Sequence, residues 1–142
     1  MILNSNIIAS KIGTCSTNLN FQYSNITTSG RGCKSNEGLG KGSISPNCSG
    51  TGAGHAGKGG MSKECPSVIP GLSYDTKVTD TMYEGSGGGS SENTTGGSGG
   101  GMVWLSLLNH LRINNTQIKA DGENATSVNS IFGSGGGSGG SI

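Results

Sequence analysis

Charged and aromatic residues are scarce in this sequence, and their scarcity excludes several classes of function. Only 12% of the 142 residues are charged, and only 4% are aromatic. The 9 Lys and Arg residues nearly balance the 8 Asp and Glu residues, and no basic cluster occurs. Nucleic acids and anionic membrane surfaces are bound by concentrated positive charge, so we expect neither as a partner. Disordered chains usually carry more charge than this one, so the composition is not typical of disorder. We therefore expect a folded chain in which the backbone does much of the packing.

Long hydrophobic runs are also missing. Hydrophobic residues make up 30% of the chain, and the longest apolar stretch, residues 102–108, is far too short to cross a bilayer. The first ten residues lack the basic start and the apolar stretch of a secretion signal. Either a signal has been removed or the sequence is a piece of a longer chain. Because the sequence ends within a glycine pattern, we expect residues 1–142 to be a single glycine-rich domain of a longer chain.

Residue sets typical of catalysis or metal binding do not stand out. Metal sites normally use close cysteine pairs, and none occurs here, although His55 with Cys48 and Cys65 could surround zinc. We favour a turn histidine between two disulfide-bonded cysteines, and a solvated position at a strand end for His110. No Ser–His–Asp or Cys–His arrangement exceeds what chance supplies. We therefore expect no enzyme, no catalytic residue, no metal site and no cofactor.

A glycine-rich stretch at residues 52–59 matches the spacing of the dinucleotide fingerprint and, through Gly52, Gly57 and Lys58, nearly that of a phosphate-binding loop. Both sites require a buried strand before the loop and a helix after it. Residues 45–50 have the composition of a loop, and residues 59–66 have no helical period. Since such matches are frequent in a glycine-rich chain, we do not expect nucleotide binding.

Three acidic residues lie in a polar stretch that also contains Tyr74 and Tyr83. Asp75, Asp80 and Glu84 are five and four positions apart, whereas calcium loops place their ligands at tighter, alternating spacing. Calcium binding and acid–base chemistry are the alternatives, and we favour a solvated loop.

Cysteines and glycosylation motifs point to an oxidising, secreted environment. The four cysteines, Cys15, Cys33, Cys48 and Cys65, allow two disulfides in three connectivities. Disulfides persist outside the cytosol, so we expect an extracellular or cell-surface protein. N-linked glycans are expected at the Asn-x-Ser/Thr acceptors, which are Asn25, Asn47, Asn93, Asn114 and Asn124.

Glycine is abundant, with 29 residues, and it recurs in blocks. The pentapeptide Gly-Ser-Gly-Gly-Gly occupies residues 85–89, 97–101 and 133–137. A flexible linker is one interpretation of these blocks. We favour ordered backbone packed closely on other backbone, which only glycine permits, because the blocks alternate tightly with strand signals.

A second repeat carries isoleucine in a strand-like context. Residues 25–31 align with residues 117–123, and residues 6–10 resemble a third copy, 19 residues before the first. Residues 19–26, 102–108 and 111–120 alternate as strands do. A spacing of 19 residues suits one coil of a parallel β-helix. We therefore predict an all-β fold, a β-solenoid with glycine-rich turns, in which coil-to-coil hydrogen bonds satisfy the backbone.

The order of the blocks resembles the glycine-rich regions of large cell-surface proteins of ciliates and plants. The matching segments are residues 52–60, Tyr83, residues 85–89, 97–105, 118–122 and 135–142. The likeness covers roughly residues 25–142, with Glu84 in place of the glycine that usually follows the tyrosine. In ciliates such regions often precede cysteine-rich repeats resembling ephrin-receptor modules. The resemblance implies a location and an architecture rather than an activity, and the many Asn and Ile residues are ciliate-like.

These observations predict an extracellular structural glycoprotein whose solenoid units associate end to end into a rod or filament. A carbohydrate-binding or adhesion module of a larger surface protein is the alternative. A β-helix polysaccharide enzyme comes third, because the sequence offers no catalytic set for it.

Overall fold

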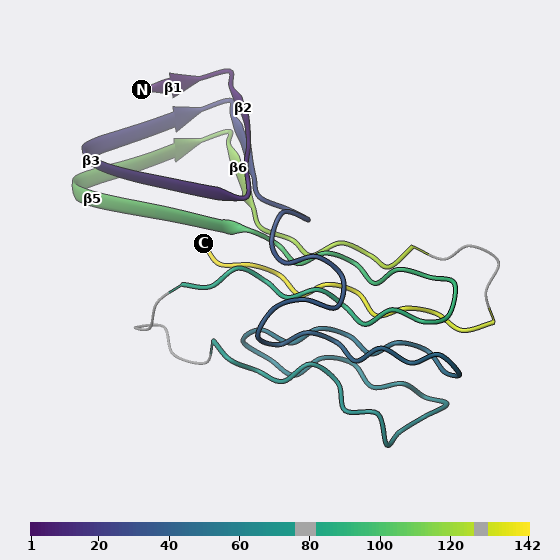
Figure 1. Ribbon diagram of the computed structural model, residues 1–142. Coiled ribbons are helices and arrows are strands. Elements are labelled where there is room, and N and C mark those ends of the chain that lie inside the picture. The colour runs from purple at the N-terminus through teal and green to yellow at the C-terminus, as the bar shows by residue number, and fades with distance from the viewer. Residues whose placement is uncertain (76–81, 127–130) are drawn as a thin grey trace.

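The computed structural model describes residues 1–75, 82–126 and 131–142, in which six strands and no helix occur. The strands are short except for β3 and β5 (Figure 1). Their bounds are Ile2–Leu3 for β1, Asn6–Ile8 for β2, Lys11–Gln22 for β3, Asn25–Thr27 for β4, Met102–Asn114 for β5 and Gln117–Lys119 for β6.

The strands form two three-stranded parallel sheets, in the orders β1-β3-β5 and β2-β4-β6. Asn6 pairs with Asn25, which pairs in turn with Gln117, so the aligned repeats of the sequence are neighbours in the second sheet. This part of the sequence prediction is confirmed. We call residues 2–8, 21–27 and 113–119 tiers 1, 2 and 3, since each passes from the first sheet into the second.

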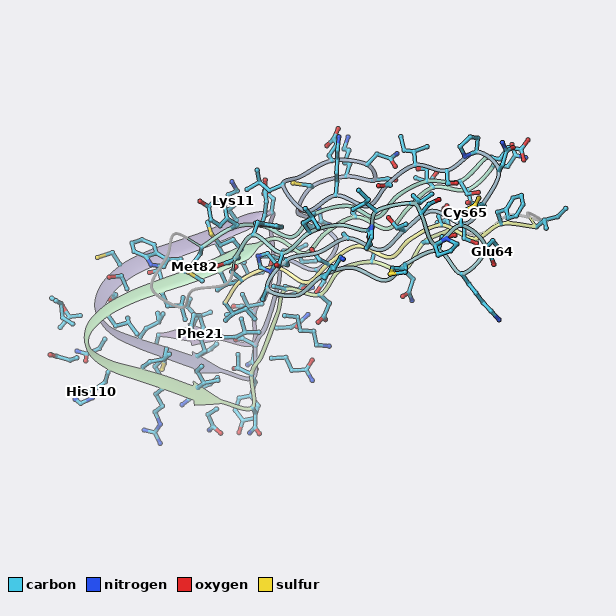
Figure 2. All side chains as sticks on the ribbon, turned by 90° about the horizontal axis from the view of Figure 1, so that it is seen from below. Lys11, Phe21, Glu64, Cys65, Met82 and His110 are labelled. Atoms are coloured by element: carbon cyan, nitrogen blue, oxygen red, sulfur yellow. A yellow bond between two sulfur atoms is a disulfide. The ribbon has the colours of Figure 1, made fainter. Side chains whose placement is uncertain are left out.

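A small apolar core lies between the two sheets. Leu19, Phe21, Ile26 and Val103 are buried, and alternate residues of the strands pack around them. The partly buried residues that pack against this cluster are Ile2, Ile7, Ile12, Leu105, Leu107 and Ile118. Figure 2 shows Phe21 among the strands, and His110 at the bend of β5. The pairing register of β3 with β5 shifts between Ser16 and Asn18, where both strands bend.

The predicted β-solenoid is wrong. The strands end in two open sheets, and the described part of the chain contains no closed sheet or continued coil. After tier 2 the chain leaves the sheets, and residues 28–101 separate β4 from β5. The physical reason is that the backbone groups of this segment form hydrogen bonds in a different pattern from that of a strand, so the 19-residue repeat does not continue.

The glycine-rich residues form extended segments that run side by side in layers (Figure 1). Their backbone hydrogen bonds recur at every third residue, which is the period of the polyproline II helix and not the two-residue period of a strand. Such pairs are Gly85 to Gly100 with Gly88 to Gly97, Gly97 to Gly135 with Gly100 to Ser138, and Cys33 to Gly85 with Asn36 to Gly88. We call this part of the molecule the glycine bundle.

The central segment of the glycine bundle, residues 85–89, is entirely buried. From Gly85 to Ser90 every backbone N–H donates a hydrogen bond and every carbonyl accepts one, with partners in several other segments. A Cβ added at Gly87, Gly88 or Gly89 would collide with a neighbouring backbone carbonyl. The interpretation of ordered, backbone-on-backbone packing is therefore confirmed, and the flexible linker is excluded for these residues.

Candidate functional site

A polar depression lies where each tier turns from the first sheet into the second. Three non-glycine residues occupy this corner with positive φ: Asn4 at 47°, Tyr23 at 49° and Asn115 at 45°. Positive φ turns the chain sharply, and asparagine tolerates it better than most residues. The three corners therefore stack in one column across the tiers.

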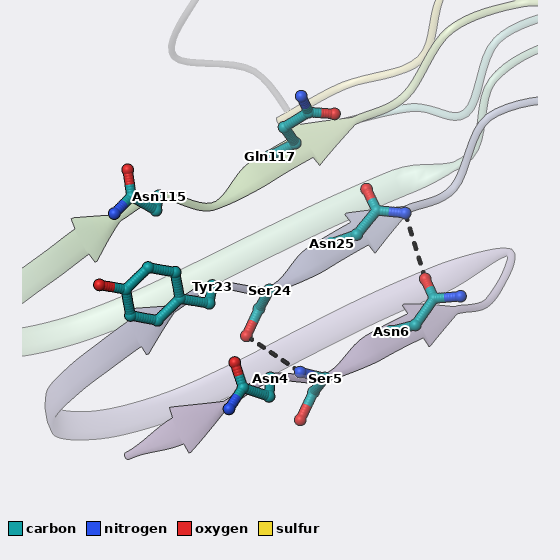
Figure 3. A pocket seen from close by; sticks show the side chains of 8 residues that line it. All are labelled: Asn4, Ser5, Asn6, Tyr23, Ser24, Asn25, Asn115 and Gln117. Atoms are coloured by element: carbon teal, nitrogen blue, oxygen red, sulfur yellow. Dashed lines mark hydrogen bonds between the residues drawn. The ribbon is translucent and has the colours of Figure 1, made fainter.

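Two further columns complete the corner. Ser5, Ser24 and Thr116 follow the positive-φ residues, and Asn6, Asn25 and Gln117 open the strands of the second sheet. The resulting depression, which we call the corner groove, has a volume of about 550 Å³ (Figure 3). It is lined by Asn4, Ser5, Asn6, Tyr23, Ser24, Asn25, Asn115 and Gln117.

Hydroxyl groups bind the tiers together beneath the groove. The Ser24 hydroxyl accepts the Ser5 N–H at 3.4 Å and donates to the Gln22 carbonyl at 2.9 Å. One tier further, the Thr116 hydroxyl accepts the Ser24 N–H at 3.3 Å. The Asn25 amide donates to the Asn6 side-chain oxygen at 3.1 Å (Figure 3). The corner is thus a fixed polar ladder rather than a loose loop.

Part of this polar surface has no partner among the residues that the structure describes. Among the described residues, no hydrogen bond is made by the side-chain amides of Asn4, Asn115 and Gln117. Tyr23 is 60% exposed at the middle of the first column. The lining contains no Asp, Glu, Lys, Arg or His. The groove therefore offers amide and hydroxyl groups and one aromatic ring to an uncharged, hydrogen-bonding ligand.

A second polar cluster lies in the glycine bundle around His55. Its Nε2 is 3.3 Å from Asp75 Oδ2, and both side chains are largely buried, but the approach does not have hydrogen-bond geometry. The His55 ring packs on Tyr74, which in turn meets Tyr83 edge to face. The Ser141 hydroxyl lies 2.7 Å from the Tyr83 carbonyl oxygen and 3.3 Å from Asp75 Oδ2, and it makes no hydrogen bond with His55. A nucleophilic triad needs the serine on the histidine, so this cluster lacks that arrangement.

The acidic residues singled out in the sequence therefore do not all lie in a solvated loop. Glu84 is partly buried. Its carboxylate accepts a hydrogen bond from the Cys33 thiol at 3.7 Å and lies 3.6 Å from the Lys11 ammonium. Asp75 is held by the His55 cluster, and Asp80 lies outside the described residues. The described residues contain no group of three His, Cys, Asp or Glu that could hold a metal ion.

The stretch that matches nucleotide-binding loops uses its amides elsewhere. The N–H groups of Gly52, Ala53 and Gly54 donate to the carbonyls of Gly60, Gly136 and Gly40 at 2.8–3.1 Å. No helix follows the loop in the described residues. These amides are committed to backbone partners and do not point at a phosphate position.

One of the two expected disulfides is present. Cys48 is bonded to Cys65, at the end of the glycine bundle far from the strands (Figure 2), whereas Cys15 and Cys33 are free thiols. This bond removes both candidate sulfur ligands of a zinc site at His55. Burial, reinforced by the Glu84 carboxylate, raises the pKa of the Cys33 thiol.

The two free thiols should react at different rates. We expect Cys15, which is exposed, to be alkylated faster by iodoacetamide at pH 8 than Cys33, because only the thiolate reacts and burial opposes its formation at Cys33. Mass spectrometry of peptides after timed labelling of the native protein measures both rates. Equal rates in the native protein would contradict the placement of Cys33.

Alkaline pH should destabilise the fold. Burial raises the pKa of Cys33 and of the Tyr74 phenol above their ordinary values of 9.0 and 10.0, so the unfolded chain loses these protons first. The stabilisation that the two protonated groups contribute is complete below about pH 9. It declines as the pH rises through the higher pKa values of the two groups in the folded state. Urea unfolding at pH 7 and pH 10 measures the loss, which Cys33→Ser should reduce and Cys15→Ser should leave unchanged.

All five predicted glycan acceptors, Asn25, Asn47, Asn93, Asn114 and Asn124, are exposed. Each asparagine is therefore accessible, and Asn25 also borders the corner groove. The repeats visible in the sequence begin at Asn6, Asn25 and Gln117, so they do not include the corner residues Asn4, Tyr23 and Asn115 and do not predict the groove.

Comparisons with models of known protein families, with curated proteins and with solved structures find no match for this chain. The described residues also contain no helix that is long and apolar enough to cross a membrane.

Proposed function

We propose that this chain is a structural unit of an extracellular glycoprotein, and that copies of it associate through the open edge of tier 3. The observation that carries the proposal is unequal burial at equivalent positions. In the central tier 2, Phe21 and Ile26 are 3% and 1% exposed, whereas in the outer tier 3 the partner of Phe21, Ile113, is 46% exposed and the partner of Ile26, Ile118, is only partly buried. A further strand beside β5 would bury this apolar surface as β5 buries that of β3.

Tier 1 of a second copy is the occupant that fits this edge. Tiers 1 and 3 have the same corner, with φ of 47° at Asn4 and 45° at Asn115, and each is the outer tier of both sheets. Placed in the register that joins tiers 1 and 2, Ile2 and Ile7 of the second copy would cover Ile113 and Ile118. Because the two surfaces differ, the contact is head to tail, and it continues into a filament when the rotation between copies does not close a ring.

Two features support an extracellular setting for such an assembly. The Cys48–Cys65 disulfide is typical of oxidising compartments, and the five glycan acceptors are exposed. Glycans on the flanks of a filament would also discourage lateral pairing of exposed strands. The resemblance to glycine-rich surface proteins agrees with this setting.

A charged residue at the open edge should prevent the association. We expect the unaltered chain to sediment as concentration-dependent oligomers, and Ile113→Lys to sediment as a monomer, because edge lysines block strand addition. Leu108→Lys is the matched control, since Leu108 lies in the same strand and is already 82% exposed. Circular dichroism verifies that each variant is folded.

Sedimentation velocity with electron microscopy decides between the outcomes. Filaments that are lost in Ile113→Lys and retained in Leu108→Lys support the proposal. A chain that stays monomeric at high concentration, or oligomers that form equally well in both variants, would overturn it.

A further inference from the structure

We infer that the corner groove binds an uncharged, β-linked oligosaccharide, with one sugar ring beside each tier. This inference is independent of edge association, because it uses the face of the corner rather than the open edge.

The repeat distance of the groove matches that of an extended glycan. Neighbouring parallel strands are about 4.8 Å apart, which is close to the length of one pyranose residue in an extended β-linked chain. The same three columns of side chains recur in each tier, so successive sugars would meet similar groups (Figure 3). Three tiers accommodate about three sugar rings.

The chemistry of the lining selects neutral hydroxyl groups. A side-chain amide offers a donor and an acceptor side by side, and adjacent hydroxyls on a sugar ring present the complementary pair. Asn4, Asn115 and Gln117 have both groups available. The lining contains no basic side chain to bind a sulfate or uronate, so acidic glycans gain nothing from it.

Tyr23 supplies an aromatic platform at the middle tier. Its ring is 60% exposed, although its backbone has a φ of 49°, a conformation in which a bulky residue is strained. The neighbouring tiers place asparagine at this position and achieve the same turn with less strain. The turn itself therefore does not require tyrosine, and the exposed ring of Tyr23 can pack on the apolar face of a pyranose.

The matched substitution is Tyr23→Asn, which makes the three corner residues identical. It removes the ring and keeps the turn, so the unfolding midpoint should be unchanged or raised. Leu108→Ala, an exposed position outside the groove, is the control for unspecific effects. The protein is prepared without N-linked glycans, because Asn25 borders the groove.

Isothermal titration with cellotriose, chitotriose and the corresponding monosaccharides tests the inference. We expect at least one trisaccharide to bind at least about tenfold more tightly than its monosaccharide, and Tyr23→Asn to weaken binding by about fivefold or more. The two trisaccharides distinguish a glucan from an acetamido glycan. Absence of binding by both at millimolar concentration, or equal binding by Tyr23→Asn and the parent chain, would overturn the inference.

Discussion

Gly97→Ala is expected to lower the free energy of unfolding by about 3 kcal/mol. Gly97 opens the second glycine block, is buried in the glycine bundle, and donates its N–H to the Gly135 carbonyl at 3.0 Å. A Cβ at this position would collide with the Glu123 carbonyl oxygen and crowd the Gly137 nitrogen. Since all these atoms belong to hydrogen-bonded backbone, they cannot move aside without breaking other bonds. Urea unfolding followed by circular dichroism measures the loss.

The same pentapeptide supplies the control. Gly133 opens the third block, and a Cβ there would meet no atom within 4 Å. Gly133→Ala should therefore be neutral or stabilising, by up to about 1 kcal/mol, because alanine restricts the unfolded chain. Equal losses in the two variants would show that the blocks are not packed as described.

Removal of the Cys48–Cys65 disulfide is expected to cost about 3 kcal/mol. The two cysteines are 17 residues apart, and the bond limits the freedom of this loop in the unfolded chain. This end of the glycine bundle depends strongly on the bond, because the apolar core lies at the sheets and not beside the disulfide. The double variant Cys48→Ser/Cys65→Ser, compared with the oxidised parent chain in urea, measures this loss.

Cys15→Ser provides the comparison for the disulfide. Cys15 is an exposed free thiol, so its replacement should change the unfolding free energy by less than about 0.5 kcal/mol. A double variant as stable as Cys15→Ser would mean that the Cys48–Cys65 bond constrains nothing.

The sequence allowed the tiers to be predicted because their side chains carry a pattern. Asn25, Ile26 and Thr27 pair with the three residues that the internal alignment had placed opposite them, Gln117, Ile118 and Lys119. The buried Ile26 shows why the pattern is visible: an apolar residue between polar ones marks the face that packs.

The arrangement of the glycine bundle could not be predicted in the same way. Its three-residue period is a property of backbone hydrogen bonds, and glycine has no side chain to display it in the sequence. The 19-residue spacing between tiers 1 and 2 therefore led to the wrong prediction that the coil continues as a solenoid. In the structure, the chain between tiers 2 and 3 instead passes through the glycine bundle.

The candidate site was only partly predictable. The strand-like alternation of residues 19–26 does not reveal that Asn4 and Asn115 share the backbone conformation of Tyr23, because only the pairing of the tiers brings the three together. The contact of His55 with Asp75 was missed for a similar reason, since the two residues are far apart in the sequence and meet only in the folded chain. The sequence thus indicates the chemistry of each side chain but not which side chains the fold brings together.

Residue-resolved amide hydrogen exchange tests the central claim, that main-chain hydrogen bonds hold the glycine bundle together. Residues 85–89 should exchange as slowly as Phe21 in β3, since all their amides are bonded and buried, whereas the exposed amides of Gly136 and Gly139 should exchange fast. Exchange of residues 85–89 at the rate of an unfolded peptide, while Phe21 stays protected, would contradict the account.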